Sequence, residues 1–115
     1  MRQSTIEFIN RFIEKKMPPE VESIRVFGSE VYGTPTCFSD IDLAIVSSVP
    51  LSLEQKAEID SLAIEASPLC EVQFVFVVLP LPEIYQGMDV RKNIFEKGIV
   101  IYDRKKLHGY CDRGL

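Results

Sequence analysis

The chain has 115 residues, 46% of them hydrophobic and 26% charged, which is ordinary for one soluble globular domain. Its net charge of −4 argues against the basic face that nonspecific nucleic-acid binding requires. The longest apolar stretch, residues 74–79, is too short to span a membrane, and Cys37, Cys70 and Cys111 form no disulfide or zinc pattern. We therefore expect a cytoplasmic protein that binds neither nucleic acid nor a membrane.

The first part of the chain predicts a helix, a strand and a sharp turn. Ser4 and Glu7 have the spacing of a capping box at the start of a helix over residues 4–17. A short strand over residues 23–27 follows, and the pair Gly28-Ser29 ends it. One helical turn and a loop then lead to the next strand.

Residues 40–47 alternate between apolar and polar positions, as a strand with one buried face does. The apolar positions of this strand are predicted to face the core, which leaves Asp40 and Asp42 together on the opposite face. The buried set consists of Ile41, Leu43 and Ile45.

The second half of the chain predicts two more helices and two more strands. Ser52 and Gln55 form a second capping box, which starts a helix over residues 53–66. The remaining predicted elements are a strongly apolar strand over 70–79, a helix over 83–97 and a short strand over 99–102.

This order of elements predicts an α+β fold, in which a mixed α/β sheet carries its helices on one face. We expect residues 1–104 to form a single domain. Residues 105–115 are charged and glycine-containing, so we expect a flexible or partner-bound tail.

Gly28-Ser29 is followed by ten residues and then by Asp40 and Asp42. Gly28 allows a sharp turn and a close approach to a phosphate, and Ser29 supplies a hydroxyl and a backbone N–H. Asp40 and Asp42, about 7 Å apart along one strand, present oxygens that hard cations such as Mg²⁺ prefer. This spacing predicts a metal-assisted phosphate site.

These residues resemble the nucleotidyltransferase superfamily with the polymerase-β-like palm. The resemblance rests on residues 27–29 and 39–45, and more weakly on residues 95–102. The chain's small size is similar to that of the minimal nucleotidyltransferases, including antitoxins of the MntA type.

The resemblance implies a mechanism and a set of ligands. A nucleoside triphosphate, ATP above all, would bind at Gly28-Ser29, with two Mg²⁺ or Mn²⁺ ions on Asp40 and Asp42. An acceptor hydroxyl would attack the α-phosphate and release pyrophosphate. The acceptor implied for minimal members is a protein partner, a helical HEPN-type toxin, which the antitoxin adenylylates.

The sequence departs from the family pattern at two places. Active members have a third carboxylate on the neighbouring strand, where this chain has Gln73, which cannot accept a proton at neutral pH. Glu71, two residues earlier on the same face, is either a surrogate base or a solvated strand-start residue. Members also often carry arginine after Gly-Ser, where this chain has Glu30, a carboxylate that would repel a triphosphate unless it points away.

These departures leave several functions open. An active nucleotidyltransferase and a catalytically degenerate module that binds a nucleotide or a partner both fit. Intact Asp40 and Asp42 favour the enzyme, and Gln73 favours the degenerate module. A transferase acting on a small-molecule acceptor is a third alternative, although enzymes of that kind normally carry a further domain for the acceptor.

Overall fold

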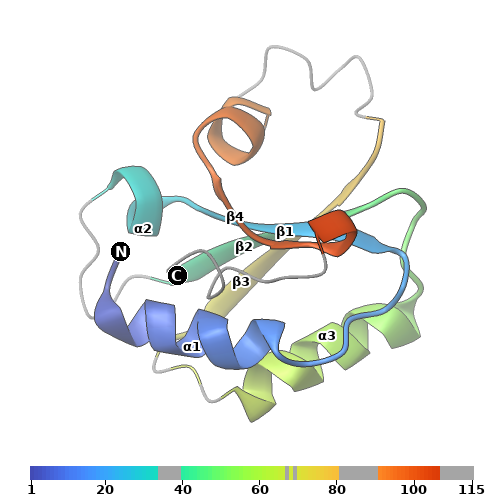
Figure 1. The fold of residues 1–115 in the computed structure, drawn as a ribbon, viewed down its shortest axis with the longest axis horizontal. Coiled ribbons are helices and arrows are strands. Elements are labelled where there is room, and N and C mark those ends of the chain that lie inside the picture. The colour runs from blue at the N-terminus through green and yellow to red at the C-terminus, as the bar shows by residue number, and fades with distance from the viewer. Residues whose placement is uncertain (34–39, 67, 69, 81–90, 107–115) are drawn as a thin grey trace.

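The computed structural model describes residues 1–33, 40–66, 68, 70–80 and 91–106. Its four strands form one mixed sheet in the order β3-β2-β1-β4 (Figure 1). Strand β2 pairs antiparallel with β1 and parallel with β3, while β1 also pairs antiparallel with β4. The strands are β1 (Val21–Phe27), β2 (Ile41–Ser47), β3 (Val72–Val78) and β4 (Ile99–Asp103).

Helices α1 (Gln3–Ile13) and α3 (Leu53–Glu65) lie on the same face of the sheet (Figure 1). Helix α2 (Ser29–Tyr32) is one turn directly after β1. The predicted α+β fold with a mixed sheet is confirmed. No helix in the described part of the chain has the length and apolar character to cross a membrane.

Of the two predicted capping boxes, one is present in the structure and the other is not. Ser52 caps α3 as expected, because its hydroxyl accepts from the Gln55 N–H while the Gln55 side chain accepts from the Ser52 N–H. The capping box predicted at Ser4 is wrong. Helix α1 begins at Gln3 with Arg2 at the N-cap and no side-chain cap, since a guanidinium has only donors and cannot accept from the helix N–H groups.

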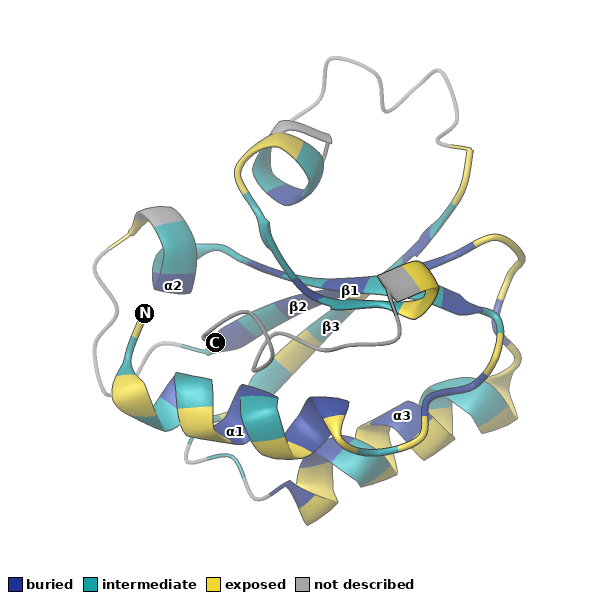
Figure 2. Cartoon of the chain, in the orientation of Figure 1, coloured by how far each residue is buried: buried dark blue, intermediate teal, exposed yellow. Residues whose placement is uncertain are grey.

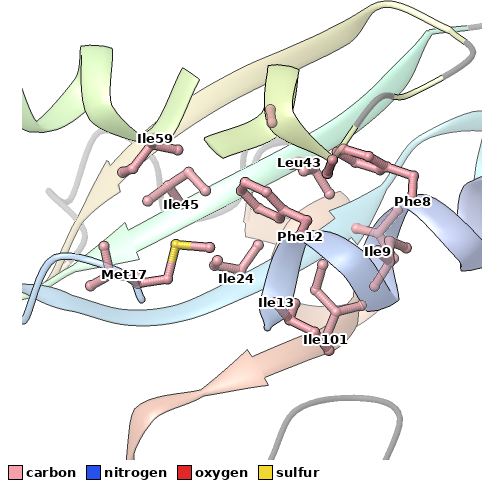
Figure 3. Packing of buried hydrophobic residues seen from close by; sticks show 14 of the residues in the cluster. Phe8, Ile9, Phe12, Ile13, Met17, Ile24, Leu43, Ile45, Ile59 and Ile101 are labelled. Atoms are coloured by element: carbon pink, nitrogen blue, oxygen red, sulfur yellow. The ribbon is translucent and has the colours of Figure 1, made fainter. Parts of the chain in front are cut away.

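The main core fills the space between the sheet and the two helices (Figures 2 and 3). Phe8 and Phe12 of α1 stack with ring centroids 5.5 Å apart, and Phe74 of β3 packs against Phe12. The side chains predicted to face the core from the central strand, Ile41, Leu43 and Ile45, all do so. The period-2 pattern therefore gave the correct face of β2.

The opposite face of the sheet is partly covered. The predicted helix over 83–97 is described only from residue 91 onward, where Arg91–Glu96 forms a π-helix. This π-helix lies across the sheet from α1 and α3 (Figure 1), and its Ile94 packs with Ala44, Val46 and Val77 in a second, smaller cluster. The helices thus do not all share one face, and Asp42 lies on the same face as the smaller cluster, at the end of β2 that precedes Ala44. Arg104–Lys106, at the start of the predicted tail, forms a 3-10 turn.

Candidate active site

The turn after β1 is shaped by Gly28. Its φ of 79° and ψ of −149° are backbone angles that residues with a side chain rarely adopt. A Cβ at this position would overlap with Oδ2 of Asp42. The turn and the Asp42 carboxylate are therefore in direct contact, which only glycine permits.

The sheet topology explains why Gly28 and Asp42 meet. Phe27, the last residue of β1, pairs with Asp42 near the start of the antiparallel strand β2. Asp40 lies immediately before β2 and is half-buried, like Asp42. Burial raises the pKa of the Asp42 carboxyl above its ordinary value, and the charges of Asp40 and Glu30 raise it further.

Gln73 lies beside Asp42, because the two residues are register partners on the parallel strands β3 and β2. Its side chain is exposed. Glu71 is also exposed and precedes β3, and its carbonyl oxygen accepts a hydrogen bond from the Ile41 N–H at 2.9 Å. Gln73 thus lies next to Asp42, and the backbone of Glu71 lies next to Ile41, between Asp40 and Asp42.

Glu30 points away from the turn's open side. Its side chain is fully buried, and its carboxylate accepts hydrogen bonds from Arg2 Nε and Thr5 Oγ1, both at 2.6 Å. The Glu30 carboxylate is thus paired inside the domain with a cation and a hydroxyl, although its charge still acts on Asp42. The Arg2 contact was missed from the sequence, because nothing in the pattern joins residues 28 positions apart.

Arg25 adds a cation to the same sheet face, two residues before Phe27. Its guanidinium lies over the Phe95 ring, 4.9 Å from the centroid. Burial lowers the pKa of Arg25, and the charge of Asp103 opposes this shift. Its Nε is buried without a hydrogen-bond partner among the described residues.

The arrangement of oxygens fits a hard divalent cation. The negative charge of Asp40 acts on the carboxyl of Asp42. Mg²⁺ binds such neighbouring carboxylates together with water and phosphate oxygens. Within the described ranges, however, no group of three or more His, Cys, Asp or Glu side chains is placed to hold a metal ion. The number of ions that Asp40 and Asp42 hold, two by the resemblance, stays a prediction.

Residues 7–107 match the model of the family described as "Polymerase beta, Nucleotidyltransferase". The chain belongs to this nucleotidyltransferase family. The match includes every predicted site residue and nearly the whole described domain. No curated protein matches the chain at a significant level.

The solved structures that resemble this nucleotidyltransferase domain include three with TM-scores between 0.55 and 0.62. Spectinomycin adenyltransferase AAD(9) from Enterococcus faecialis, solved with ATP and spectinomycin, has 18% identity and a TM-score of 0.62 over 86% of this chain. The domain spans 56% of that enzyme's chain. The likeness shows the fold.

The other two structures are toxin–antitoxin complexes. One, with AMP-PNP, has 21% identity and a TM-score of 0.57 over 91% of this domain and 77% of that chain. The second contains a tri-AMPylated Shewanella oneidensis HEPN toxin with MNT antitoxin, and has 19% identity and a TM-score of 0.55 over 90% of this domain and 76% of that chain. At these identities the fold alone is shared.

Proposed function

We propose that this domain transfers a nucleoside monophosphate from a nucleoside triphosphate, ATP above all, to a hydroxyl on a protein partner. The observation that carries the proposal is the contact between the Gly28 turn and Asp42. This contact sets a phosphate-binding backbone directly against a carboxylate suited to a metal. Family membership over residues 7–107 supports the same reaction class.

In this proposal each residue has a defined task. The backbone N–H and hydroxyl of Ser29 bind the triphosphate, and Gly28 keeps the turn close to the carboxylates. Asp40 and Asp42 hold Mg²⁺ or Mn²⁺, which when bound neutralises phosphate charge and polarises the phosphoryl oxygens. The acceptor oxygen attacks the α-phosphorus, the bond to the bridging oxygen breaks, and pyrophosphate leaves.

The acceptor's proton needs a base. Gln73, beside Asp42, cannot take this proton. Among the described residues at the start of β3, Glu71 has the carboxylate that could accept it. Glu71 is exposed and precedes the strand. It is therefore less well placed to take the acceptor's proton than a carboxylate in register with Asp42 would be. We therefore expect slow transfer.

The register of Gln73 with Asp42 also favours a second candidate function. A domain that binds metal and nucleotide without transferring it would keep Asp40 and Asp42 and tolerate Gln73. The two candidates differ in turnover and agree on ligand binding.

The partner is proposed to be a helical HEPN-type chain, as in a toxin–antitoxin pair. Two of the solved structures that share this fold are toxin–antitoxin complexes, one of them with an AMPylated HEPN toxin. We propose the helix predicted over residues 83–97 and the tail beyond Asp103 as the docking surfaces for this partner. Both lie largely outside the described residues.

Ligand binding is tested by thermal unfolding. Mg²⁺ or Mn²⁺ with ATP should stabilise the wild type by about 2.7 kcal/mol at a hundredfold excess over the Kd. Asp42→Ala should abolish this gain, while Asp60→Ala on the exposed side of α3 should retain it. An unmoved wild-type melting curve at saturating metal and ATP would refute the proposed site.

Transfer and partner are tested together. Affinity purification from the native host should recover a stable helical partner, and α-labelled ATP should then label that partner. Recovery of the domain alone would count against the toxin–antitoxin assignment, whereas nucleotide binding without labelling would favour the degenerate module.

A further inference from the structure

A buried carboxylate follows the phosphate-binding turn by one residue. The side chain of Glu30 is fully buried, yet it has the residue type that a triphosphate site disfavours. A charge is stable in such a place only when it is paired and hydrogen-bonded. Arg2 Nε and Thr5 Oγ1 supply the partners, each at 2.6 Å, and Figure 1 shows the N-terminus beside α2.

Helix α2 needs such a partner to keep its place. It is a single turn, in which the Val31 N–H donates to the Gly28 carbonyl and the Gly33 N–H donates to the Ser29 carbonyl. An isolated turn of this length is unstable in water. Its orientation therefore depends on its contacts with the rest of the domain, which include the packing of Val31 on the main core and the polar contacts of Glu30.

Arg2 extends the same network to the other side of the site. Its Nη1 donates to Sγ of Cys70 at 3.3 Å. Cys70 precedes Glu71, whose carbonyl holds the N–H of Ile41 between the two aspartates. One guanidinium thus contacts both segments that flank Asp40 and Asp42.

We propose that Glu30 is a positioning residue, which with Arg2 and Thr5 fixes the Gly28-Ser29 turn at the distance from Asp42 that a metal-bound triphosphate requires. This inference rests on the proposed function, in which the turn binds the triphosphate. Because Gly28 already touches Asp42, a small tilt of α2 changes the spacing between phosphate donors and carboxylates. Glu30 acts through the position of the turn and does not touch the nucleotide.

Position and charge give opposite expectations for variants of Glu30. If Glu30 acts only through its charge, then Glu30→Gln and Glu30→Met should both tighten ATP binding, because both remove a negative charge near the triphosphate. If it acts as a positioning residue, Glu30→Met should weaken ATP binding about tenfold, because both hydrogen bonds are lost. Glu30→Gln should retain most of the affinity, because its amide oxygen still accepts from Arg2 and Thr5.

The experiment measures the Kd of ATP with Mg²⁺ and the Kd of Mn²⁺ alone, below the melting transition of every variant. Arg2→Met should weaken ATP binding like Glu30→Met, and Mn²⁺ binding should change less than ATP binding in both. Thr5→Val removes a single hydrogen bond at nearly constant volume, so it tests the same point if the other variants fold poorly. The matched controls are Glu22→Met and Arg104→Met, which break the exposed ion pair at 3.1 Å and should leave the ATP Kd unchanged.

A third readout needs no nucleotide. In the ligand-free protein, the amide resonances of Gly28 and Ser29 should move in Glu30→Met and stay near their wild-type positions in Glu30→Gln. ATP binding by Glu30→Met that equals or exceeds the wild type would overturn this inference alone. Absence of ATP binding in the wild type would overturn the proposed function, and unmoved Gly28 and Ser29 resonances would separately overturn the positioning of the turn.

Discussion

Gln73 on β3 stands in register with Asp42 on the parallel strand β2. Neighbouring residues in register lie on the same sheet face, so a carboxylate at position 73 would face the acceptor together with Asp42. Gln73→Asp should therefore raise the rate of nucleotidyl transfer by about a hundredfold or more, which is the lower range for a positioned general base. Labelled ATP and the purified partner provide the measurement.

The matched control is Val75→Asp, which adds a carboxylate on the same face of β3 but in register with Ala44. It should give no gain. Glu71→Ala should slow the wild type only if Glu71 serves as the base. Fast wild-type transfer that is indifferent to Glu71→Ala would show that neither residue supplies the base, and our interpretation of position 73 would be wrong.

Removal of the Asp42 charge should stabilise the ligand-free protein at neutral pH. The folded-state pKa of Asp42 is raised by burial and by the charges of Asp40 and Glu30, so its ionisation opposes folding. Asp42→Asn should therefore raise the melting temperature at pH 7.

The sign of this effect fixes its pH dependence. The wild type loses stability as pH rises from the unfolded-state pKa through the raised folded-state pKa, so the advantage of Asp42→Asn should disappear on acidification below 3.8, the ordinary value. Asp60→Asn on exposed α3 serves as the control. A destabilised Asp42→Asn at pH 7 without metal would contradict the role of Asp42 as a strained, functional carboxylate.

Gly28→Ala should destabilise the fold and impair nucleotide binding together. The positive φ costs a residue with a Cβ about 1–2 kcal/mol, and the overlap with Asp42 Oδ2 adds to this. In the double variant Gly28→Ala/Asp42→Ala, the loss of stability caused by the overlap should disappear. The loss caused by the positive φ should remain. Chemical denaturation of the four proteins of this cycle gives the coupling, and strict additivity would mean that the two residues do not touch.

Phe12→Ala should show how far the domain relies on its main core. Phe12 is fully buried between Phe8 and Phe74, so truncation should cost about 3–5 kcal/mol. Leu53→Ala, at a position 84% exposed on α3, should change the free energy of unfolding by about 0.5 kcal/mol or less. Similar losses in both variants would contradict the described packing.

The parts of the fold that could be predicted from sequence are those with local signals. Alternation along β2, the Ser52 capping box and the break at Gly28 gave their elements to within a residue or two. Helix α1 was predicted too long and with the wrong cap, because Arg2 is fixed by Glu30 and the helix ends at Ile13 although Met17 is still buried. Tertiary contacts decide both ends, and no local pattern carries them.

The candidate site shows the same division. The spacing of Gly28, Asp40 and Asp42 is local enough to be read directly. The sheet register places Gln73 beside Asp42, on the neighbouring strand where the resemblance implies the third carboxylate. The role of these residues in binding and catalysis stays a prediction. The burial of Glu30 and the cation–π contact of Arg25 with Phe95 could not be foreseen, because each joins residues far apart in the sequence.

The strand order places β1, near the start of the chain, between β2 and β4, the last strand. Ser23 pairs with Asp103, so β4 can join the sheet only when two segments far apart in the sequence have met. Bringing such distant segments together costs conformational entropy and is slow. Pairing of β1 with β2 and of β2 with β3 spans shorter separations. We therefore expect Gly28, Asp42 and Gln73 to be assembled early in folding. A released chain that ends before Ile99 would hold these three residues, while the edge of β1 that pairs with β4 would lack its partner strand.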